Sequence, residues 1–353
     1  PEQADTTVWK SVDLDHAWRR AGWCDAPIST YRLHFSTAPH SPNENDYGML
    51  IHRAGNRLRV WINGHLAMQW GSLEQPNADY SNQPLYAHFP SHFLRTTDGS
   101  NQHTVLIQMA GDCRRYTGLS HLEIGAHRLL EPRWQSQNRM QVGLTIAVIS
   151  VSTLISLGSF AFAGMTKKRR AWMFAIASGA WAIRATLWMM NDLPMPYPLW
   201  FFLIDACFGV WMALTCILAL RLCGAYHKRL EQAQWWSLWI FFASSIATLL
   251  GAPAFLKGLG IDVLIVAGTA ALLYVIGSAF RSPNYSNISL SAAGIPMLVL
   301  GLVDHWNVWM SNAPDAYQRF YFTPLIVLFF IVAIASLMMR QFHGAMRTDA
   351  RYR

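Results

Sequence analysis

Two hydrophobic patterns divide this chain. Residues 136–342 contain successive stretches of about 20 mostly apolar residues, the length a helix needs to cross a membrane. The connections between these stretches are short, which is typical of antiparallel neighbours. The pattern predicts a bundle of seven transmembrane helices. The stretches are Met140–Gly164, Trp172–Asn191, Leu199–Cys223, Ser237–Leu256, Ile261–Phe280, Ile288–Trp309 and Thr323–Phe342.

Residues 1–135 show the other pattern, short runs of alternating residues between turns, which predict β-strands. Leu58–Trp70 gives the clearest signal, because its two runs meet at Asn63-Gly64, a pair that accepts the positive φ of a tight hairpin turn. We expect an all-β domain, a β-sandwich or jelly roll, with no segment of helical length. The expected strands are Tyr31–Ser36, Met49–Arg53, Arg57–Ile62, His65–Trp70, Pro84–Phe89, Thr104–Met109 and His121–Ile124.

Charge is distributed unevenly between the two parts. Residues 1–139 hold 13 Lys/Arg and 13 Asp/Glu, so the whole net charge of +8 belongs to the hydrophobic part. No basic face interleaved with aromatic residues is present, which argues against a nucleic-acid partner. A membrane protein shows this excess when its basic loops face the cytoplasm.

The basic residues also predict the orientation of the bundle, because cytoplasmic loops carry an excess of Lys and Arg. They follow the first, third and fifth stretches, at Lys167–Arg170, Lys228–Arg229 and Arg281. The opposite loops contain only Lys257 and Arg319. We therefore expect a bacterial inner-membrane protein whose helices contact lipid. Its C-terminus would lie in the cytoplasm and its β-domain outside the membrane.

Export of the β-domain requires a signal sequence, which we expect to have been cleaved or to lie outside the numbering that begins at Pro1. An oxidising compartment would allow a disulfide between Cys24 and Cys113, although the sequence does not supply the distance between them. We expect the remaining cysteines, in the third hydrophobic stretch, to be apolar filler. They are Cys207, Cys216 and Cys223.

Five segments of the N-terminal half follow one another in a recognisable order: Trp9-Lys-Ser-Val-Asp-Leu, Tyr31-Arg-Leu-His-Phe, Val60-Trp-Ile-Asn-Gly, Leu85-Tyr-Ala-His-Phe-Pro and His103-Thr-Val-Leu-Ile-Gln. In this order they resemble a galactose-binding-like jelly roll, a fold of carbohydrate-binding modules and of some glycosidase N-terminal domains. With seven helices attached, the chain resembles the bacterial seven-transmembrane receptors with diverse intracellular signalling modules. The resemblance implies an outer sensor for a ligand, with sugar as a candidate.

Such receptors continue into a histidine kinase or diguanylate cyclase, a cytoplasmic output that is dimeric in the kinase case. Residues 343–353 would begin a linker to such a module, or the protein signals through a partner. Two alternatives remain: an accessory subunit of a larger membrane complex, and a transporter. Against transport, the sequence shows no internal repeat and no interrupted helix pair.

A ligand patch is expected in the loop and strand that follow the hairpin, because sugars are held by aromatic faces and planar polar side chains. The alternative is that Trp70 and Tyr86 pack in the sandwich core. The candidate residues are Trp70, Tyr80, Asn82, Gln83 and Tyr86.

The sequence predicts no enzyme, cofactor or metal site. Ten of the thirteen histidines lie in the β-domain, but only His88 and His92 have a spacing used by metal ligands, and a Phe-Pro-Ser loop separates them. No nucleophile elbow, phosphate loop or recognisable carboxylate pair occurs. No lysine lies inside a hydrophobic stretch, which excludes a retinal Schiff base.

Ionisable residues inside the hydrophobic stretches form the last candidate site. An unpaired charge there costs at least about 2.5–3.5 kcal/mol, so we expect these groups to face the bundle interior and pair. The simplest prediction pairs Arg184 with Asp205 or Asp304, either as a fixed structural pair or as a relay that swaps partners. The complete set is Arg184, Asp205, Asp262, Asp304 and His305.

Overall fold

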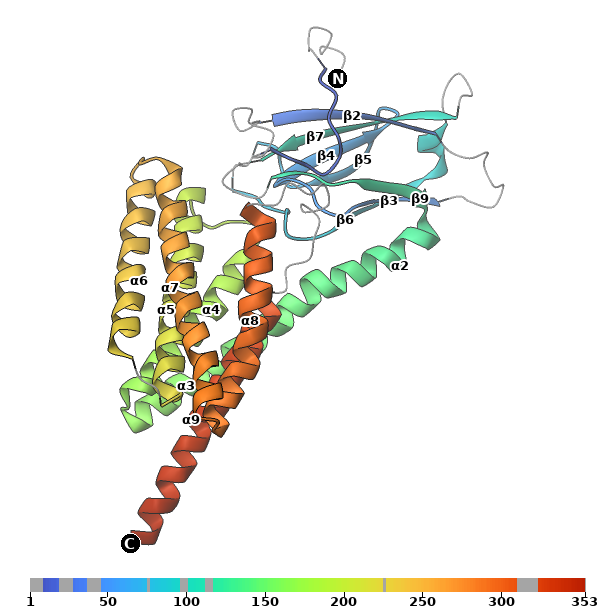
Figure 1. The fold of residues 1–353 in the computed structure, drawn as a ribbon. Coiled ribbons are helices and arrows are strands. Elements are labelled where there is room, and N and C mark those ends of the chain that lie inside the picture. The colour runs from blue at the N-terminus through green and yellow to red at the C-terminus, as the bar shows by residue number, and fades with distance from the viewer. Residues whose placement is uncertain are drawn as a thin grey trace. The chain divides into compact units, whose positions relative to one another are not determined.

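The computed structural model divides into two compact units, one up to Gln141 and one from Val142 onward (Figure 1). Cys24, Cys113 and Arg319 lie outside the residues that it describes. Side chains 254, 307–309 and 342–352 are also not described. The described residues are 9–18, 28–36, 46–74, 77–95, 101–111, 117–224, 227–309 and 323–352.

The first unit contains two larger antiparallel sheets, with strand orders β2-β7-β4-β5 and β6-β3-β9. A separate two-stranded sheet pairs β1 with β8. The first sheet comprises β2 (Ile28–Ser36), β7 (Gln102–Ala110), β4 (Arg57–Ile62) and β5 (His65–Trp70). The second comprises β6 (Leu85–Pro90), β3 (Asp46–Ile51) and β9 (Leu122–Ala126). The short elements are β1 (His16–Ala17), β8 (Gly118–Leu119) and the 3₁₀ turn η1 (Ser91–Leu94).

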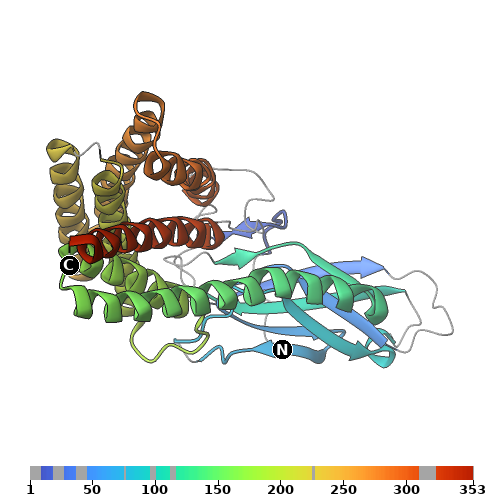
Figure 2. The same ribbon diagram turned by 90° about the horizontal axis from the view of Figure 1, so that it is seen from below.

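Both larger sheets contribute to one hydrophobic core. Alternate residues of β4 and β7 are buried, as expected for strands with one face on a core. Met49 and Ile51 of β3 reach the same core, whereas Leu50 points to the opposite face and is also fully buried. Helix α2 (His127–Asn138) contacts β3, β6 and β9, which accounts for that second buried face (Figure 2).

All seven predicted strands are confirmed, with β4 and β5 matching residue for residue. The hairpin turn is confirmed as well, since Asn63 and Gly64 have φ angles of 46° and 83°. The expectation of no helix in this part is wrong. Helix α2 has little apolar periodicity, contains Pro132 and buries only Leu130, so its sequence does not predict an amphipathic helix.

The second unit contains seven long helices within its described residues (Figure 1). Five helical segments are apolar and long enough to cross a membrane: His127–Thr166, Tyr197–Leu222, Phe255–Arg281, Tyr285–Trp306 and Thr323–Gln341. The other two are more polar, because α4 contains Arg184 and α6 begins with Lys228 and Arg229. The helices are α3 (Leu144–Thr166), α4 (Arg169–Met189), α5 (Tyr197–Leu222), α6 (Lys228–Leu249), α7 (Ala254–Arg281), α8 (Tyr285–Trp309) and α9 (Thr323–Tyr352).

The prediction for the fourth helix, Ser237–Leu256, is wrong at both ends. Helix α6 starts at Lys228 because the His227 side chain accepts a hydrogen bond from the Leu230 amide and caps it. The helix ends at Leu249, before Gly251, whose φ of 102° is accessible mainly to glycine. The prediction used hydropathy alone, which reports neither the His227 cap nor the turn at Gly251.

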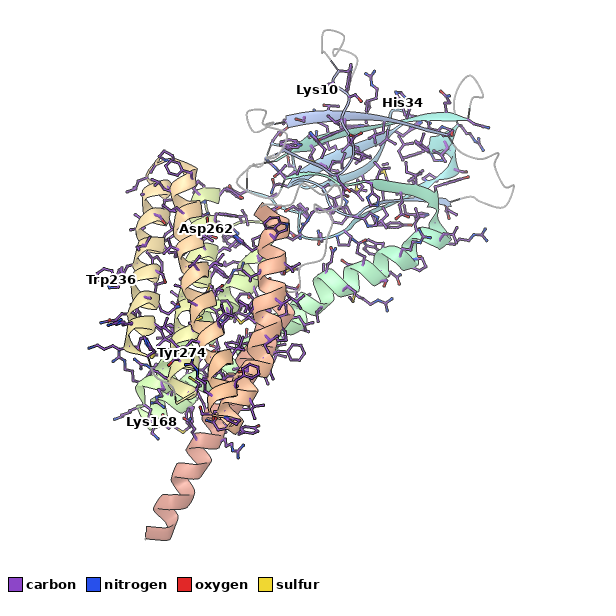
Figure 3. The ribbon with its side chains drawn as sticks, in the orientation of Figure 1. Lys10, His34, Lys168, Trp236, Asp262 and Tyr274 are labelled. Atoms are coloured by element: carbon purple, nitrogen blue, oxygen red, sulfur yellow. The ribbon has the colours of Figure 1, made fainter. Side chains whose placement is uncertain are left out.

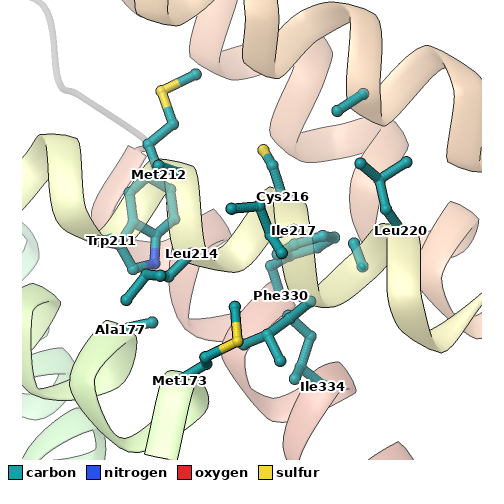
Figure 4. Packing of buried hydrophobic residues seen from close by; sticks show 14 of the residues in the cluster. Met173, Ala177, Trp211, Met212, Leu214, Cys216, Ile217, Leu220, Phe330 and Ile334 are labelled. Atoms are coloured by element: carbon teal, nitrogen blue, oxygen red, sulfur yellow. The ribbon is translucent and has the colours of Figure 1, made fainter. Parts of the chain in front are cut away.

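Helix α5 is the most enclosed candidate span of the second unit, and the core forms around it (Figure 4). Trp211 of α5 meets Trp181 of α4 with ring centroids 4.7 Å apart. On the other side of α4, a Cβ on Gly179 would lie 2.9 Å from Ser156 Oγ of α3. Helices α3 and α4 thus approach closely at the small residues Ala175 and Gly179, since Ser156 also donates to the Ala175 carbonyl at 3.5 Å.

Candidate functional site

The expected ligand patch is divided between two places. Trp70 at the end of β5 meets Tyr80 edge-on, with ring centroids 5.7 Å apart, and both rings pack partly against the core. Asn82 and Gln83 are half-buried in the turn that follows. Tyr86 lies on β6 and faces α2 instead, so it does not share a surface with the Trp70–Tyr80 pair.

Tyr86 belongs to a chain of contacts that holds α2 on the second sheet. Its ring stacks on Trp134 at 5.5 Å, and its hydroxyl lies 2.7 Å from His127 Nδ1. Burial, and secondly the negative charge of Glu131, raise the pKa of Tyr86 to about 12. The hydroxyl therefore stays protonated beside Nδ1, and the other ring nitrogen of His127, Nε2, lies 3.3 Å from Glu131.

Two histidines and a carboxylate meet beside this helix. His52 follows β3, and its Nε2 lies 3.0 Å from Glu123 Oε1 of β9. The His121 ring lies 4.6 Å from that of His52. One ligand atom from each of the three residues lies within 4.8 Å of the others, an arrangement that can hold a metal ion. We call these three residues the His52 cluster.

Neighbouring side chains fix the His52 cluster in place. Gln137 Oε1 lies 2.8 Å from His52 Nδ1, and Arg133 Nη1 lies 2.8 Å from Glu123 Oε2. Asp15 accepts a hydrogen bond of 3.1 Å from the His121 amide, and its Oδ1 is 3.8 Å from His121 Nδ1. Two of these three supporting residues, Arg133 and Gln137, belong to α2.

The Glu123 carboxyl is ionised in this environment. Burial alone would raise its pKa, but the hydrogen bonds and positive charges of His52 and Arg133 outweigh burial and lower it. Glu123 therefore presents a carboxylate, with one oxygen on Arg133 and the other beside His52.

In the helical unit, Asp205 pairs with Lys257. The partner predicted from the sequence was Arg184. Arg184 is held by aromatic faces: its guanidinium lies 5.0 Å from the Trp181 ring and 5.3 Å from the Phe208 ring. Asp205 still attracts Arg184 electrostatically across a longer distance. The prediction failed because Lys257 was assigned to a loop, whereas it lies in the first turn of α7 and reaches α5.

The other predicted intramembrane groups also find different partners. Asp304 accepts hydrogen bonds from the Thr323 amide at 2.8 Å and the Thr323 hydroxyl at 2.5 Å, so it caps the start of α9. His305 lies 3.6 Å from Asp262 of α7. Asp304 and His305 thus connect α8 to two different helices.

A buried ion pair at the opposite end of the unit was missed by the sequence analysis. Arg221 near the end of α5 pairs with Glu231 in the first turn of α6, with 3.1 Å between Nε and Oε2. Arg221 also lines a cavity of about 400 Å³ with basic residues from the start of α4. The sequence contains a signal for this pair, because Glu231 is an acidic residue directly after the basic residues Lys228 and Arg229.

The His52 cluster was also missed, because His52 is far in sequence from the other two residues. The spacing His121-x-Glu123 next to a strand was the available signal, since residues two apart point to the same face of a sheet. His88 and His92, the pair with metal-ligand spacing, have different ring partners: His88 lies 4.3 Å from His127 and His92 lies 6.1 Å from His65.

The three cysteines of the helical unit form no disulfide. Cys207, Cys216 and Cys223 are free thiols, and the last two are buried in the core, as predicted for apolar filler. No known protein-family model matches the chain, and no curated protein matches it.

Proposed function

We propose that this protein is the sensor and transmembrane relay of a bacterial signalling receptor. In this proposal, residues 1–135 bind a ligand outside the inner membrane and seven helices carry the signal to a cytoplasmic kinase, cyclase or partner protein. The single observation that carries it is the helical run His127–Thr166. Its first part is bonded to a sheet of the β-domain, and its last part is a candidate membrane span.

A helix of this kind suits a relay, because its backbone hydrogen bonds make it stiff along its axis. Forty residues correspond to about 60 Å at 1.5 Å per residue. The run contains one irregularity, the π-helical segment η2 (Arg139–Gly143), and such segments are frequent at functional positions in helices. Movement of the sheet against α2 would thus reach α3 through η2.

We propose that α4 and α6 also cross the membrane, in addition to the five apolar segments. The directions in which neighbouring helices run support this. The C-terminal ends of α3 and α5 line the same cavity through Phe162 and Leu222, so these two helices cross in the same direction. Asp205 near the start of α5 pairs with Lys257 near the start of α7, so α7 also follows this direction. These shared directions support the proposal that the connecting helices α4 and α6 cross back.

Hydrogen exchange on the full chain in membrane vesicles tests the relay. The double variant Arg133→Ala/Gln137→Ala removes two contacts between α2 and the His52 cluster. We expect faster amide exchange in α2, in η2 and in the first turns of α3. Leu129→Ala is the matched control, since Leu129 is 62% exposed on the same helix.

The relay is contradicted when exchange in α2 rises in the double variant while η2 and α3 remain as in the control. Solute flux through the same vesicles would favour a transporter over a receptor. Binding of a sugar to the β-domain would support the jelly-roll resemblance and the Trp70–Tyr80 surface as its site.

A further inference from the structure

We propose that the His52 cluster binds a divalent transition-metal ion, with zinc as the physiological choice. The ligands are one ring nitrogen each from His52 and His121 and Oε1 of Glu123, the oxygen that Arg133 does not bind. Two imidazoles and one carboxylate are a ligand set that zinc accepts, with a fourth position left for water. The inference deepens the sensor role proposed above, and it depends on that role only for its effect on the membrane helices.

His52 is oriented by a polar contact at each ring nitrogen. Its Nδ1 lies 2.8 Å from Gln137 Oε1, and its Nε2 lies 3.0 Å from Glu123 Oε1. Because Gln137 holds Nδ1, Nε2 is the nitrogen that a metal would take. A metal-binding histidine is usually oriented in this way by a hydrogen bond from its other nitrogen.

The Glu123 carboxylate is oriented by Arg133. Arg133 occupies Oε2 of Glu123 at 2.8 Å, which leaves Oε1 directed at His52. In the absence of metal, His52 supplies the hydrogen bond to that oxygen. A bound ion would lie between Nε2 and Oε1 in place of this hydrogen bond and coordinate both atoms.

The His52 cluster is open to solvent, and its ligand atoms lie close to the spacing that zinc requires. The side chains of His52, Glu123 and His121 are 18%, 31% and 43% exposed, so an ion can enter from solvent while the ligands remain restrained. Ligand atoms around tetrahedral zinc lie about 3.3 Å apart for bonds of about 2.0–2.1 Å. His52 and Glu123 already meet this spacing, and a side-chain rotation of His121 would close the remaining gap.

The site is linked to α2 by its supporting residues. Gln137 and Arg133 both lie on the helix that leads into the first candidate span, so an ion that fixes His52 and Glu123 also fixes their hydrogen bonds to α2. We therefore expect the metal to tighten α2 on its sheet and to slow amide exchange there.

Zinc titration of the full chain in detergent, followed by calorimetry, is the first measurement, and Co²⁺ serves as a spectroscopic probe. We expect one strong site per chain and visible absorption bands from bound Co²⁺ with nitrogen and oxygen ligands. His52→Gln, His121→Gln and Glu123→Gln should each weaken zinc binding at least about tenfold, and Gln137→Leu about 10–100-fold. Thermal unfolding without metal verifies that each variant is folded.

His65→Gln is the matched control, because His65 lies in the same domain and contacts His92 and Phe93 but not the cluster. It should leave zinc binding unchanged. The proposal is overturned by zinc binding that is equal in all variants, or by several weak sites that weaken equally in the control. Either result would mean adventitious binding to surface histidines only.

Hydrogen exchange with and without zinc separates this inference from the relay. Strong zinc binding without any change beyond α2 would support the metal site and contradict the relay. Absence of zinc binding, together with altered exchange in α3 of the Arg133→Ala/Gln137→Ala variant, would contradict the metal site and support the relay.

Discussion

At the scale of single residues, one carboxylate of the helical unit, that of Asp205, interacts with two cations. Asp205 pairs directly with Lys257 and also attracts Arg184, so one carboxylate serves two cations. Arg184 draws further support from the faces of Trp181 and Phe208. The loss of Asp205 therefore leaves two cations without their counter-charge, whereas the loss of Lys257 leaves Arg184 nearby.

This asymmetry leads to a stability prediction. Removing one partner of a fully buried ion pair costs about 3–5 kcal/mol, because the other charge stays buried. Asp205 and Lys257 are half-buried, so the loss should fall below that range. We expect Asp205→Asn to destabilise the protein more than Lys257→Met, with partial recovery in the double variant. Thermal unfolding of the purified protein in detergent measures the difference.

Arg281→Met provides the control, because Arg281 lies at the exposed far end of the same helix as Lys257. It should change stability by less than about 0.5 kcal/mol, the usual limit for surface substitutions. Single variants at Lys257 and Asp205 that unfold like this control would show that the ion pair contributes nothing to stability.

At the scale of elements, close approaches between helices depend on glycines. A Cβ on Gly209 of α5 would lie 2.5 Å from Phe241 Cε1 of α6, and Phe241 is fully buried. We expect Gly209→Ala to destabilise the protein by about 1–3 kcal/mol, as overpacking does. Phe241→Leu in the same chain should restore part of the loss, which thermal unfolding can measure.

The comparison variant for this contact is Gly277→Ala on α7. A Cβ on Gly277 would meet no heavy atom within 4 Å in the described part of the chain, so alanine should be neutral or stabilise the helix by up to about 1 kcal/mol. Equal effects of the two substitutions would indicate that helix propensity, and not the α5–α6 contact, determines the outcome.

Elements with a regular apolar period were predictable from sequence, and elements held by polar contacts were not. The alternation in Arg57–Ile62 and the Asn63-Gly64 turn specified the hairpin. Helix α2 escaped prediction because bonds from Arg133, Trp134 and Gln137 hold it, and such partners lie far away in sequence. The same reason concealed the His52 cluster and the Asp205–Lys257 pair, while the individual charges were recognised.

At the scale of the whole molecule, basic residues of the helical unit gather at one end of it. Lys168, which precedes α4, and Arg169 and Arg170 in its first turn share a cavity with Arg221 in the last turns of α5 and with Met338 and Gln341 of α9. Figure 3 shows Lys168 and Asp262 at opposite ends of the bundle. The loop pattern that predicted the orientation thus corresponds to one physical end of the structure.

The orientation of this end in the membrane is the last prediction, since the positive-inside rule places it in the cytoplasm. In chains whose native cysteines are replaced by serine, single cysteines at Lys168 and at Leu250 report the two ends. Leu250 is 82% exposed and lies in the turn between α6 and α7, on the predicted outer side. We expect a membrane-impermeant maleimide to label Leu250→Cys in sealed spheroplasts and to label Lys168→Cys only after the membrane is opened.

A cysteine at Asn63, in the β4–β5 turn, should react like Leu250→Cys because the proposed sensor domain is outside. Labelling of Lys168→Cys in sealed spheroplasts would invert the orientation and remove the basis for an external sensor. Labelling of Leu250→Cys and Lys168→Cys from the same side would contradict the proposed crossings of α4 and α6.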